Sequence, residues 1–320
     1  LSPWDMHDER YGTDAYNDYF CNQLTELLTN YGEIFEVWFD GAKGSNAKKF
    51  EYDWQRYYDL IRKLQPKANI AICGPDIRWV GNEGGKSRNC EYSVVPCALR
   101  EADRIMALSQ QDENQASSLQ KYNQMDEDLG SRKILEKNAY LCWFPAEVDV
   151  SIRKGWFFHE KDNRNSKSAK KLFKIYLNSV GNNCTLLLNI PPNAQGEIHK
   201  KDVKNLEKLG KMINNITKNP IVYHELGELT KDNGFIDFTF NDVRKVNYVV
   251  LQEDIANSQR VELFDLYIQK ANGKFKRVYK GTVIGAKKIV NLKGKKAKGI
   301  RFVIRQSRST PIIKSVGIYE

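Results

Sequence analysis

The chain has 320 residues, enough for two domains with sizeable cores. With 41% hydrophobic and 28% charged residues it has the composition of a folded globular protein, which excludes a disordered chain. No apolar run approaches the roughly 20 residues of a membrane span, so we expect none. The net charge of +10 comes largely from scattered lysines. The lysine-rich run at 293–298 (KGKKAK) lacks interleaved aromatic residues, so we interpret it as a solvated turn and not as a nucleic-acid patch.

The first ten residues, LSPWDMHDER, have neither a basic start nor an apolar signal region. Any targeting peptide would therefore lie upstream. With such a peptide we would expect a secreted or periplasmic protein, and without one the localisation stays open.

The cysteines and histidines form no metal-binding pattern. Six cysteines include no CxxC pair, and Cys73, Cys142 and Cys184 lie in or beside apolar runs, which favours buried free thiols. A Cys90–Cys97 bridge is the alternative. Four histidines without ligand spacing predict no metal site.

The first 215 residues alternate between predicted helices and strands. A helix ending at Gly32 is expected to bury Phe20, Leu24, Leu27, Leu28 and Tyr31. Further helices are predicted at 54–64, before Pro66, at 172–180 and around 206–213. Strands are predicted at 34–39, 69–76, 139–147 and 185–192.

Apolar strands separated by helices predict parallel βαβ units with both faces of the sheet covered. We therefore predict an α/β fold, a partial (β/α)8 TIM-like barrel of about five strands over residues 1–217, counting a stub at Leu1–Asp5. Polar residues end the four predicted strands, where sites gather in such folds: Asp40, Asp76, Glu147 and Asn189. A polar stretch at 109–128 is expected to form a surface insertion.

Past residue 220, short alternating runs predict an antiparallel β-sandwich over residues 221–320. Asn272-Gly273 is expected to form a hairpin turn ahead of FKRVYKG (275–281). The other strands are predicted at 235–240, 246–252, 261–269, 298–306 and 315–320.

A buried strand that ends on a carboxylate needs a reason, because water solvates an ionised Asp far better than a core does. Asp40 follows such a strand, with Gly41 behind it and Trp38 on the same side. Carboxylates beside aromatic planes suit carbohydrates, although a capping or salt-bridged Asp would also fit. A glycosidase needs a second carboxyl group as proton donor. Glu83, in a loop after Arg78 and Trp79, is the best candidate, and Glu91 and Glu147 are its rivals.

Five segments resemble the α-L-fucosidases of glycoside hydrolase family 29, in particular the branch that acts on α-1,3/1,4-linked fucose of Lewis-type glycans. They are SPWDMHDERYG (2–12), NQLTELLTNYGEIFEVWFDGAKG (22–44), GPDIRWVGNEGG (74–85), AEVDVSIRKGWFFH (146–159) and LLLNIPPNAQG (187–196). The resemblance extends into the predicted sandwich. It implies a retaining exo-fucosidase that uses no metal or organic cofactor and acts on a fucosylated oligosaccharide or glycoconjugate.

The resemblance also implies roles for individual residues. Asp40, in WFDG, is the expected nucleophile, and Glu83, in RWVGNE, is the expected acid/base. The remaining residues expected to contact the fucose or the leaving-group sugar are Trp38, Arg78, Trp79, Trp4, Asp5, His7, Glu147, Asp149 and Trp156.

Two departures from the family pattern bear on function. Residues 90–92 (CEY) stand where the family usually has a Trp-containing segment. The family's leaving-group preference therefore does not carry over to this chain. The family's upstream His-Trp-Gly motif and His-His pair, which bind fucose, are absent. We therefore expect residues 1–320 alone to be inactive, with the N-terminal barrel segment as partner. The alternative is a non-catalytic carbohydrate-binding protein with a remnant barrel.

Overall fold

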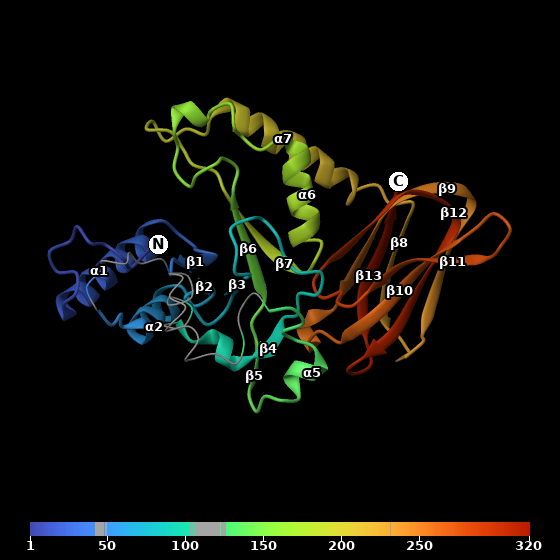
Figure 1. Ribbon diagram of the computed structural model, residues 1–320, viewed down its shortest axis with the longest axis horizontal. Coiled ribbons are helices and arrows are strands. Elements are labelled where there is room, and N and C mark those ends of the chain that lie inside the picture. The colour runs from blue at the N-terminus through green and yellow to red at the C-terminus, as the bar shows by residue number, and fades with distance from the viewer. Residues whose placement is uncertain (42–47, 49, 103–104, 106–121, 123–125, 231) are drawn as a thin grey trace. The chain divides into compact units, whose positions relative to one another are not determined.

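Figure 1 shows the computed structural model. The structure describes all residues except 42–47, 49, 103–104, 106–121, 123–125 and 231, so most of the insertion predicted at 109–128 lies outside the described residues. The chain forms two compact units. Unit 1 comprises Leu1–Gly81, Val95–Leu129 and Ile134–Pro145, and unit 2 comprises Asn82–Val94, Gly130–Lys133 and Ala146–Glu320.

Unit 1 contains a short parallel pair of strands. β1 (Glu36–Phe39) pairs with β2 (Asn69–Ile72), with Glu36 opposite Asn69 and Phe39 opposite Ile72. The helix α2 (Trp54–Leu64) connects them, and α1 (Asp14–Asn30) packs against α2. The other elements up to residue 145 are β3 (Arg78–Trp79), β4 (Val94–Pro96), η1 (Cys97–Arg100), α5 (Arg132–Leu135) and β5 (Leu141–Trp143).

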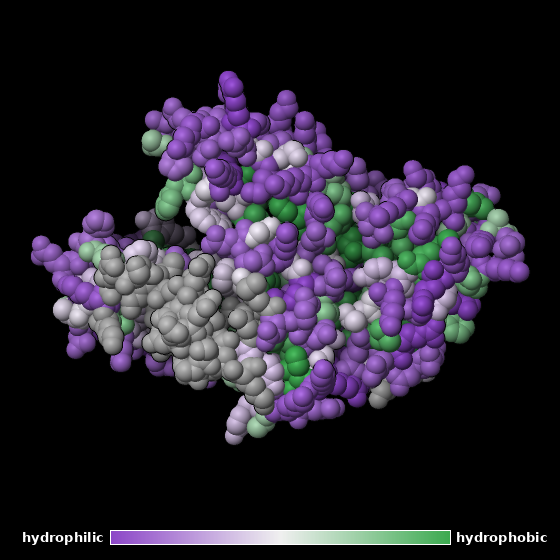
Figure 2. All heavy atoms as spheres, viewed as in Figure 1, coloured by the Kyte–Doolittle hydropathy of each residue, from purple (hydrophilic) through white to green (hydrophobic). Residues whose placement is uncertain are grey.

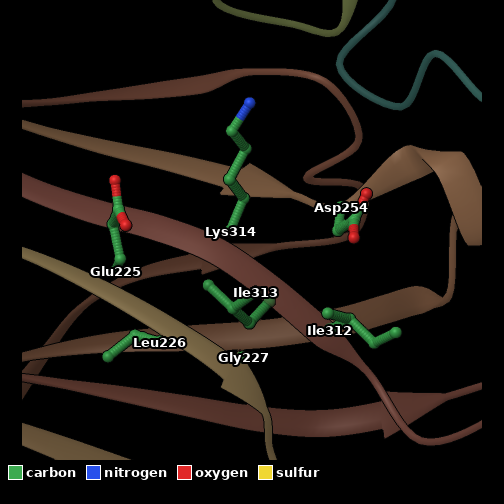
Figure 3. Close-up of a pocket in the computed structure, with 7 residues that line it drawn as sticks. All are labelled: Glu225, Leu226, Gly227, Asp254, Ile312, Ile313 and Lys314. Atoms are coloured by element: carbon green, nitrogen blue, oxygen red, sulfur yellow. The ribbon is translucent and has the colours of Figure 1, made fainter.

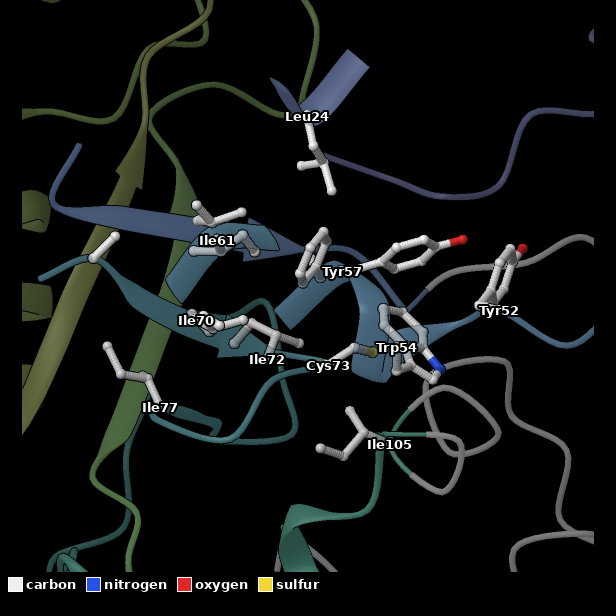
Figure 4. Close-up of a cluster of buried hydrophobic side chains, with 14 of the residues drawn as sticks. Leu24, Tyr52, Trp54, Tyr57, Ile61, Ile70, Ile72, Cys73, Ile77 and Ile105 are labelled. Atoms are coloured by element: carbon white, nitrogen blue, oxygen red, sulfur yellow. The ribbon is translucent and has the colours of Figure 1, made fainter. Parts of the chain in front are cut away.

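Aromatic side chains fill the core of unit 1, part of which Figure 4 shows. Alternation along β1 buries Phe39 completely, and its ring centroid lies 5.7 Å from that of Trp54 and 6.1 Å from that of Phe20. Each such side chain contributes roughly 1.5–3 kcal/mol when fully buried. At the start of α2, Asp53 accepts a hydrogen bond from the Arg56 amide (3.1 Å), which fixes where the helix begins.

The prediction of which side chains the first helix buries is confirmed in part. Phe20, Leu24 and Leu28 are buried, but Leu27 is 38% exposed and Tyr31 is 74% exposed. Tyr31 follows the last helical residue, and Gly32, at φ +81°, turns the chain away from the helix axis. The described residues of unit 1 therefore cover only part of the face that the spacing predicted.

Unit 2 begins with a second parallel pair. β6 (Ala146–Ser151) pairs with β7 (Cys184–Asn189), and α6 (Ala169–Ser179) connects them and packs on β7. The short helix η2 (Glu160–Asp162) precedes α6. A long helix, α7 (Lys200–Asn215), packs on α6, and Figure 2 shows hydrophilic side chains over it, as expected for a solvated lysine-rich helix.

Among the residues that the structure describes, the C-terminal part of unit 2 forms one six-stranded antiparallel sheet in the order β11-β10-β12-β9-β13-β8. Phe264, Phe302 and Leu251 lie at the centre of its apolar core. The elements are β8 (Val222–Glu228), β9 (Phe235–Glu253), η3 (Ile255–Asn257), β10 (Val261–Gln269), β11 (Phe275–Gly281), β12 (Lys288–Ser307) and β13 (Ile312–Tyr319).

The structure confirms the hairpin at Asn272-Gly273, where Gly273 has φ +80° between β10 and β11. It corrects two other predictions. The separate strands at 235–240 and 246–252 are one strand, β9, and the predicted turn at 293–298 lies within β12. A register shift between Asn291 and Lys295, with Lys293 and Gly294 at positive φ, lets β12 continue through this polar run as a bulge. Strand β8 was not predicted.

The predicted parallel strand at 139–147 is also corrected. Two strands occupy this region, β5 and β6, and β6 runs on to Ser151. Residues 1–5, predicted as a strand stub, have no strand structure. The molecule is thus a mixed α/β protein with a large antiparallel sheet, while the eight-stranded barrel, the two-layered sandwich and the division at 217–221 stay predictions.

All six cysteines are free, and Cys73, Cys142 and Cys184 are buried, as predicted. The alternative Cys90–Cys97 bridge is absent. Burial raises the pKa of the Cys142 thiol to about 12, so this thiol is inert at neutral pH. Within the described part of the chain, no helix combines the length and the apolar character that crossing a bilayer requires.

Candidate active site

Asp40 stands at the carboxyl end of β1, as predicted. Val37 and Phe39 point into the core of unit 1, while Trp38 and Asp40 occupy the alternate positions and are half-buried. The Asp40 amide donates a hydrogen bond to the Leu1 carbonyl (3.0 Å). The tryptophan ring and the carboxylate thus share one side of the strand, and Val37 and Phe39 share the other.

Arg78 and two further tryptophans also belong to unit 1. Arg78 is fully buried, and its Nε donates to the Phe144 carbonyl (3.1 Å) while its amide donates to Pro145 (2.9 Å). Trp79 and Trp4 are half-buried and pack against the same aromatic core as Trp38. These contacts fix the four side chains by packing in unit 1.

The N-terminal candidates lie in a turn. The Asp5 carboxylate accepts a hydrogen bond from the His7 amide (3.0 Å), and the Trp4 amide donates to the Ser2 hydroxyl (3.2 Å). His7 is exposed. Among the described residues, the buried Trp4 indole nitrogen has no hydrogen-bond acceptor, so it could donate to a ligand hydroxyl.

Glu83 lies in unit 2, on an exposed loop that its neighbours shape. Asn82 accepts from the Gly84 amide and donates to the Lys86 carbonyl, both at 3.0 Å. Gly85 has φ +69°, and a Cβ there would meet the Ile175 side chain at 3.1 Å. Glycine at this position therefore lets the backbone beside Glu83 lie against α6.

Trp156 meets Glu83 in unit 2. Its indole Nε1 donates to Glu83 Oε2 (3.2 Å), and its carbonyl accepts from Asn189 Nδ2 (2.9 Å) at the end of β7. Asn189 Nδ2 also donates to Ser151 Oγ (3.1 Å) at the end of β6. The carboxyl ends of two parallel strands thus hold the tryptophan that contacts Glu83. The sequence identified Trp156 but not the role of Ser151.

Glu91, the first rival for the acid role, is a structural carboxylate. It is 1% exposed and forms an ion pair with Arg88 Nε at 2.8 Å. Its Oε1 also accepts from the Arg88 amide (3.0 Å), and its carbonyl accepts from Asn183 Nδ2 (2.8 Å). A buried carboxylate held in this way stabilises the loop and is closed to a departing sugar.

Glu147 and Asp149 occupy alternate positions within β6 and are 1% and 3% exposed. Alternate positions in a strand share one face, so the two carboxylates lie on the same side of β6. The prediction placed Glu147 at the end of a strand. It is instead the second residue of β6, because the strand begins at Ala146 and ends at Ser151.

One buried ion pair in unit 2 was not predicted. Arg153 Nε lies 2.8 Å from Asp202 Oδ2, and both side chains are fully buried. Arg153 Nη1 also donates to Asn163 Oδ1 (2.9 Å), and its guanidinium lies over the Phe158 ring at 4.6 Å. These contacts tie the loop that contains Trp156 to α7.

Two of the hollows in the described part of the chain lie in other parts of the two units. One, of about 430 Å³, lies beside β8 and β13, with Glu225, Asp254 and Lys314 around it (Figure 3). Another, of about 320 Å³, lies in unit 1 beside Asp76, which is paired with Arg62. In the described part of the chain, no group of three or more His, Cys, Asp or Glu side chains could hold a metal ion.

Asp40 belongs to unit 1, and Glu83, Glu147, Asp149 and Trp156 belong to unit 2. Asp40 has a tryptophan on its own side of the strand, and Glu83 is hydrogen-bonded to another. A glycoside hydrolase uses one carboxylate as nucleophile and one carboxyl group as proton donor, and aromatic side chains contact the sugar.

The chain belongs to the alpha-L-fucosidase family, whose family model, described as Alpha-L-fucosidase, matches residues 2–217. Alpha-L-fucosidase 1 of Arabidopsis thaliana is 35% identical over 352 residues, a match that covers all of this chain and 65% of that protein. The chain thus spans less than two thirds of this relative's length.

Two solved structures resemble this chain over its whole length. One is a putative alpha-L-fucosidase from Bacteroides ovatus, with a TM-score of 0.87 and 44% identity, of which this chain covers 54%. The other is a Ruminococcus gnavus fucosidase of glycoside hydrolase family 29 in complex with fucose, with a TM-score of 0.81 and 26% identity, of which it covers 71%.

Proposed function

We propose that this chain supplies the nucleophile and the acid/base of a retaining exo-α-L-fucosidase that removes α-1,3/1,4-linked L-fucose from Lewis-type glycans. Membership of the family supports fucose as the substrate, as does the likeness to a fucosidase in complex with fucose. The observation that carries the proposal is the hydrogen bond from Trp156 to Glu83, because it holds an exposed carboxyl group ready for a ligand.

In the first step, an Asp40 carboxylate oxygen attacks the anomeric carbon of fucose. The bond from that carbon to the departing sugar oxygen breaks, and Glu83 gives its proton to this oxygen. In the second step, Glu83 takes a proton from water, whose oxygen displaces Asp40, so the configuration is retained. This chemistry requires the two carboxyl groups to lie about 5–5.5 Å apart.

Trp156 selects the oxygen of Glu83 that carries the proton. The indole N–H donates to Oε2, and an oxygen that accepts a hydrogen bond there is the poorer place for a second hydrogen. The transferable proton therefore resides on Oε1. In this arrangement Trp156 orients the acid through one defined contact.

The departure at residues 90–92 bears on the leaving group. Glu91 forms an ion pair with Arg88. Tyr92 is 5% exposed, and the Arg308 guanidinium lies 5.2 Å from the centre of its ring. These side chains pack within unit 2, so contacts to the leaving-group sugar must come from elsewhere. We assign them to Trp156 and to the turn of Trp4, Asp5 and His7.

Fucose release from a chromogenic aryl α-L-fucoside and from a Lewis-type trisaccharide tests this function in the complete open reading frame. Replacing Asp40 with Asn is expected to abolish both activities while leaving folding intact.

Azide added to an Asp40→Gly variant should yield a product of inverted configuration, because a small anion can fill the place of the carboxylate. Normal turnover in Asp40→Asn would contradict the assignment. Hydrolysis of neither substrate by the unmodified protein would favour the alternative, a carbohydrate-binding protein without catalysis.

A further inference from the structure

We propose that a hollow beside α6 in unit 2 binds an anionic saccharide, a sugar unit that carries a sulfate or carboxylate group. The hollow has a volume of about 420 Å³ and is lined by residues of α6 and of the strands β9, β11 and β12, together with Asn89 and Asn182. Ligand sites typically measure about 300–1,000 Å³. None of the catalytic candidates lines it, so the site is separate from the proposed fucose pocket.

The charge of this hollow is of one sign. Lys170, Lys174 and Lys288 line it, and none of its lining side chains is acidic. Among the described residues, these three lysines form no ion pair with a carboxylate. The hollow of Figure 3 differs, since Glu225 and Asp254 accompany its single lysine. The hollow beside α6 therefore attracts anions, and the one beside β13 does not.

Lys288 distinguishes this hollow from a group of surface lysines, because it is buried. Its side chain is 3% exposed, and its Nζ donates to Asn182 Oδ1 (2.6 Å) and to the Asn89 carbonyl (3.3 Å). Both acceptors are neutral, and an ammonium group has three donors, so one remains for a ligand. Burial lowers the pKa of Lys288 to about 8. An anion beside Nζ would compensate for the cost of burying this charge.

The other lining residues suit a sugar better than a bare ion. Asn89, Asn178 and Asn291 lie exposed around the hollow, and each amide can both donate to and accept from hydroxyl groups. Phe173 and Tyr248 meet edge to face, with ring centres 6.2 Å apart, and supply an apolar surface for the C–H face of a sugar. Amides, rings and ammonium groups together fit a saccharide that carries one negative charge.

The test uses fucose-free probes, so it does not depend on fucosidase activity. Lactose, 3′-sulfated lactose and 3′-sialyllactose are titrated calorimetrically into the full-length protein at about 0.15 M salt, where surface charges are largely screened. Binding of one or both charged sugars, at least tenfold tighter than that of lactose, is expected. Which one binds identifies the anionic group. Equal binding of all three, or equally tight binding of inorganic sulfate, would overturn the proposal.

A matched pair of double variants locates the site. Lys170→Gln with Lys174→Gln should weaken binding of the charged sugar about tenfold or more. Lys171→Gln with Lys204→Gln removes the same charge from exposed lysines that do not line the hollow, and should leave binding unchanged. All four positions are exposed, so both variants should fold, which circular dichroism checks. Equal losses in both variants would mean that only overall charge attracts the ligand, and would refute the site.

Discussion

Glu83 and Glu91 lie on one loop, but their surroundings give them different chemistry. Glu83 is exposed and bonded to a tryptophan, while Glu91 is buried and paired with Arg88. Proton donation to a leaving group requires an accessible acid, and it contributes roughly 10²–10⁴-fold to the rate. The geometry therefore favours Glu83, which spacing alone could not separate from its rivals.

Replacing Glu83 with Gln should slow hydrolysis of natural glycans by roughly 10²–10⁴-fold and of activated aryl fucosides far less, because aryl groups leave without protonation. Replacing Glu91 with Gln should instead lower stability, since breaking a buried ion pair costs about 3–5 kcal/mol. Comparing kcat/KM for the two substrate types, together with urea unfolding, distinguishes the two outcomes. The loop assignment is wrong if Glu91→Gln gives the leaving-group pattern and Glu83→Gln does not.

At the residue scale, the sequence predicted which candidate residues share a strand face, and the reason is physical. A strand that alternates between core and open side fixes which neighbours share a face, so Trp38 and Asp40 could be placed together. Glu147 was misplaced because the strand boundary was set too early, and a boundary error changes which residues end a strand. The pair Arg153–Asp202 joins residues far apart in the sequence, and no local pattern marks such a contact.

At the scale of elements, the parallel pair β1 and β2 was predictable from apolar runs alone, whereas β6 was expected at 139–147 and lies at Ala146–Ser151. The long strands β9 and β12 were not predictable, because polar residues within both strands, and positive φ angles at Lys293 and Gly294 in β12, are typical of turns. A bulge satisfies the same local preferences without ending the strand. Pairing with neighbouring strands, which lie far away in the sequence, decides between the two.

The attachment of α7 depends on Arg153 and Asp202. Asp202→Ala leaves a buried guanidinium without its partner, so unfolding free energy should fall by about 3–5 kcal/mol. The exposed pair Arg244–Glu320 is the control, because Arg244→Met should change stability by no more than about 1 kcal/mol. Urea unfolding followed by circular dichroism measures both. Similar small effects for the two variants would show that the buried pair does not hold this helix.

At the scale of the whole molecule, the parallel strands of unit 1 form only a two-stranded sheet among the described residues. In a closed barrel every strand has two neighbours, and a strand that lacks one exposes backbone and apolar surface. Phe35, beside β1, is 75% exposed, and such surface costs roughly 25 cal/mol per Å² when it stays in water. This is the pattern expected if further barrel strands pack there.

Residues 1–320 alone should therefore release no measurable fucose and should tend to aggregate. A longer chain that supplies further parallel strands beside β1 should be soluble and active. Size-exclusion chromatography and an aryl fucoside assay on the same preparations provide the comparison. A soluble monomer of residues 1–320 with full activity would contradict the partial-barrel account.

The proposed mechanism requires Asp40 to become covalently bonded to fucose during turnover. A 2-deoxy-2-fluoro fucosyl fluoride should trap this intermediate on the complete protein. The fluorine at C2 slows both steps, while the good leaving group speeds only the first, so the fucosyl-enzyme accumulates. Proteolysis and mass spectrometry should then find the added fluorofucosyl mass on the peptide that contains Asp40, and the Asp40→Asn variant should take up no label. Attachment to another carboxylate, such as Asp149, or turnover of natural substrate in a protein that never acquires the label, would contradict the account.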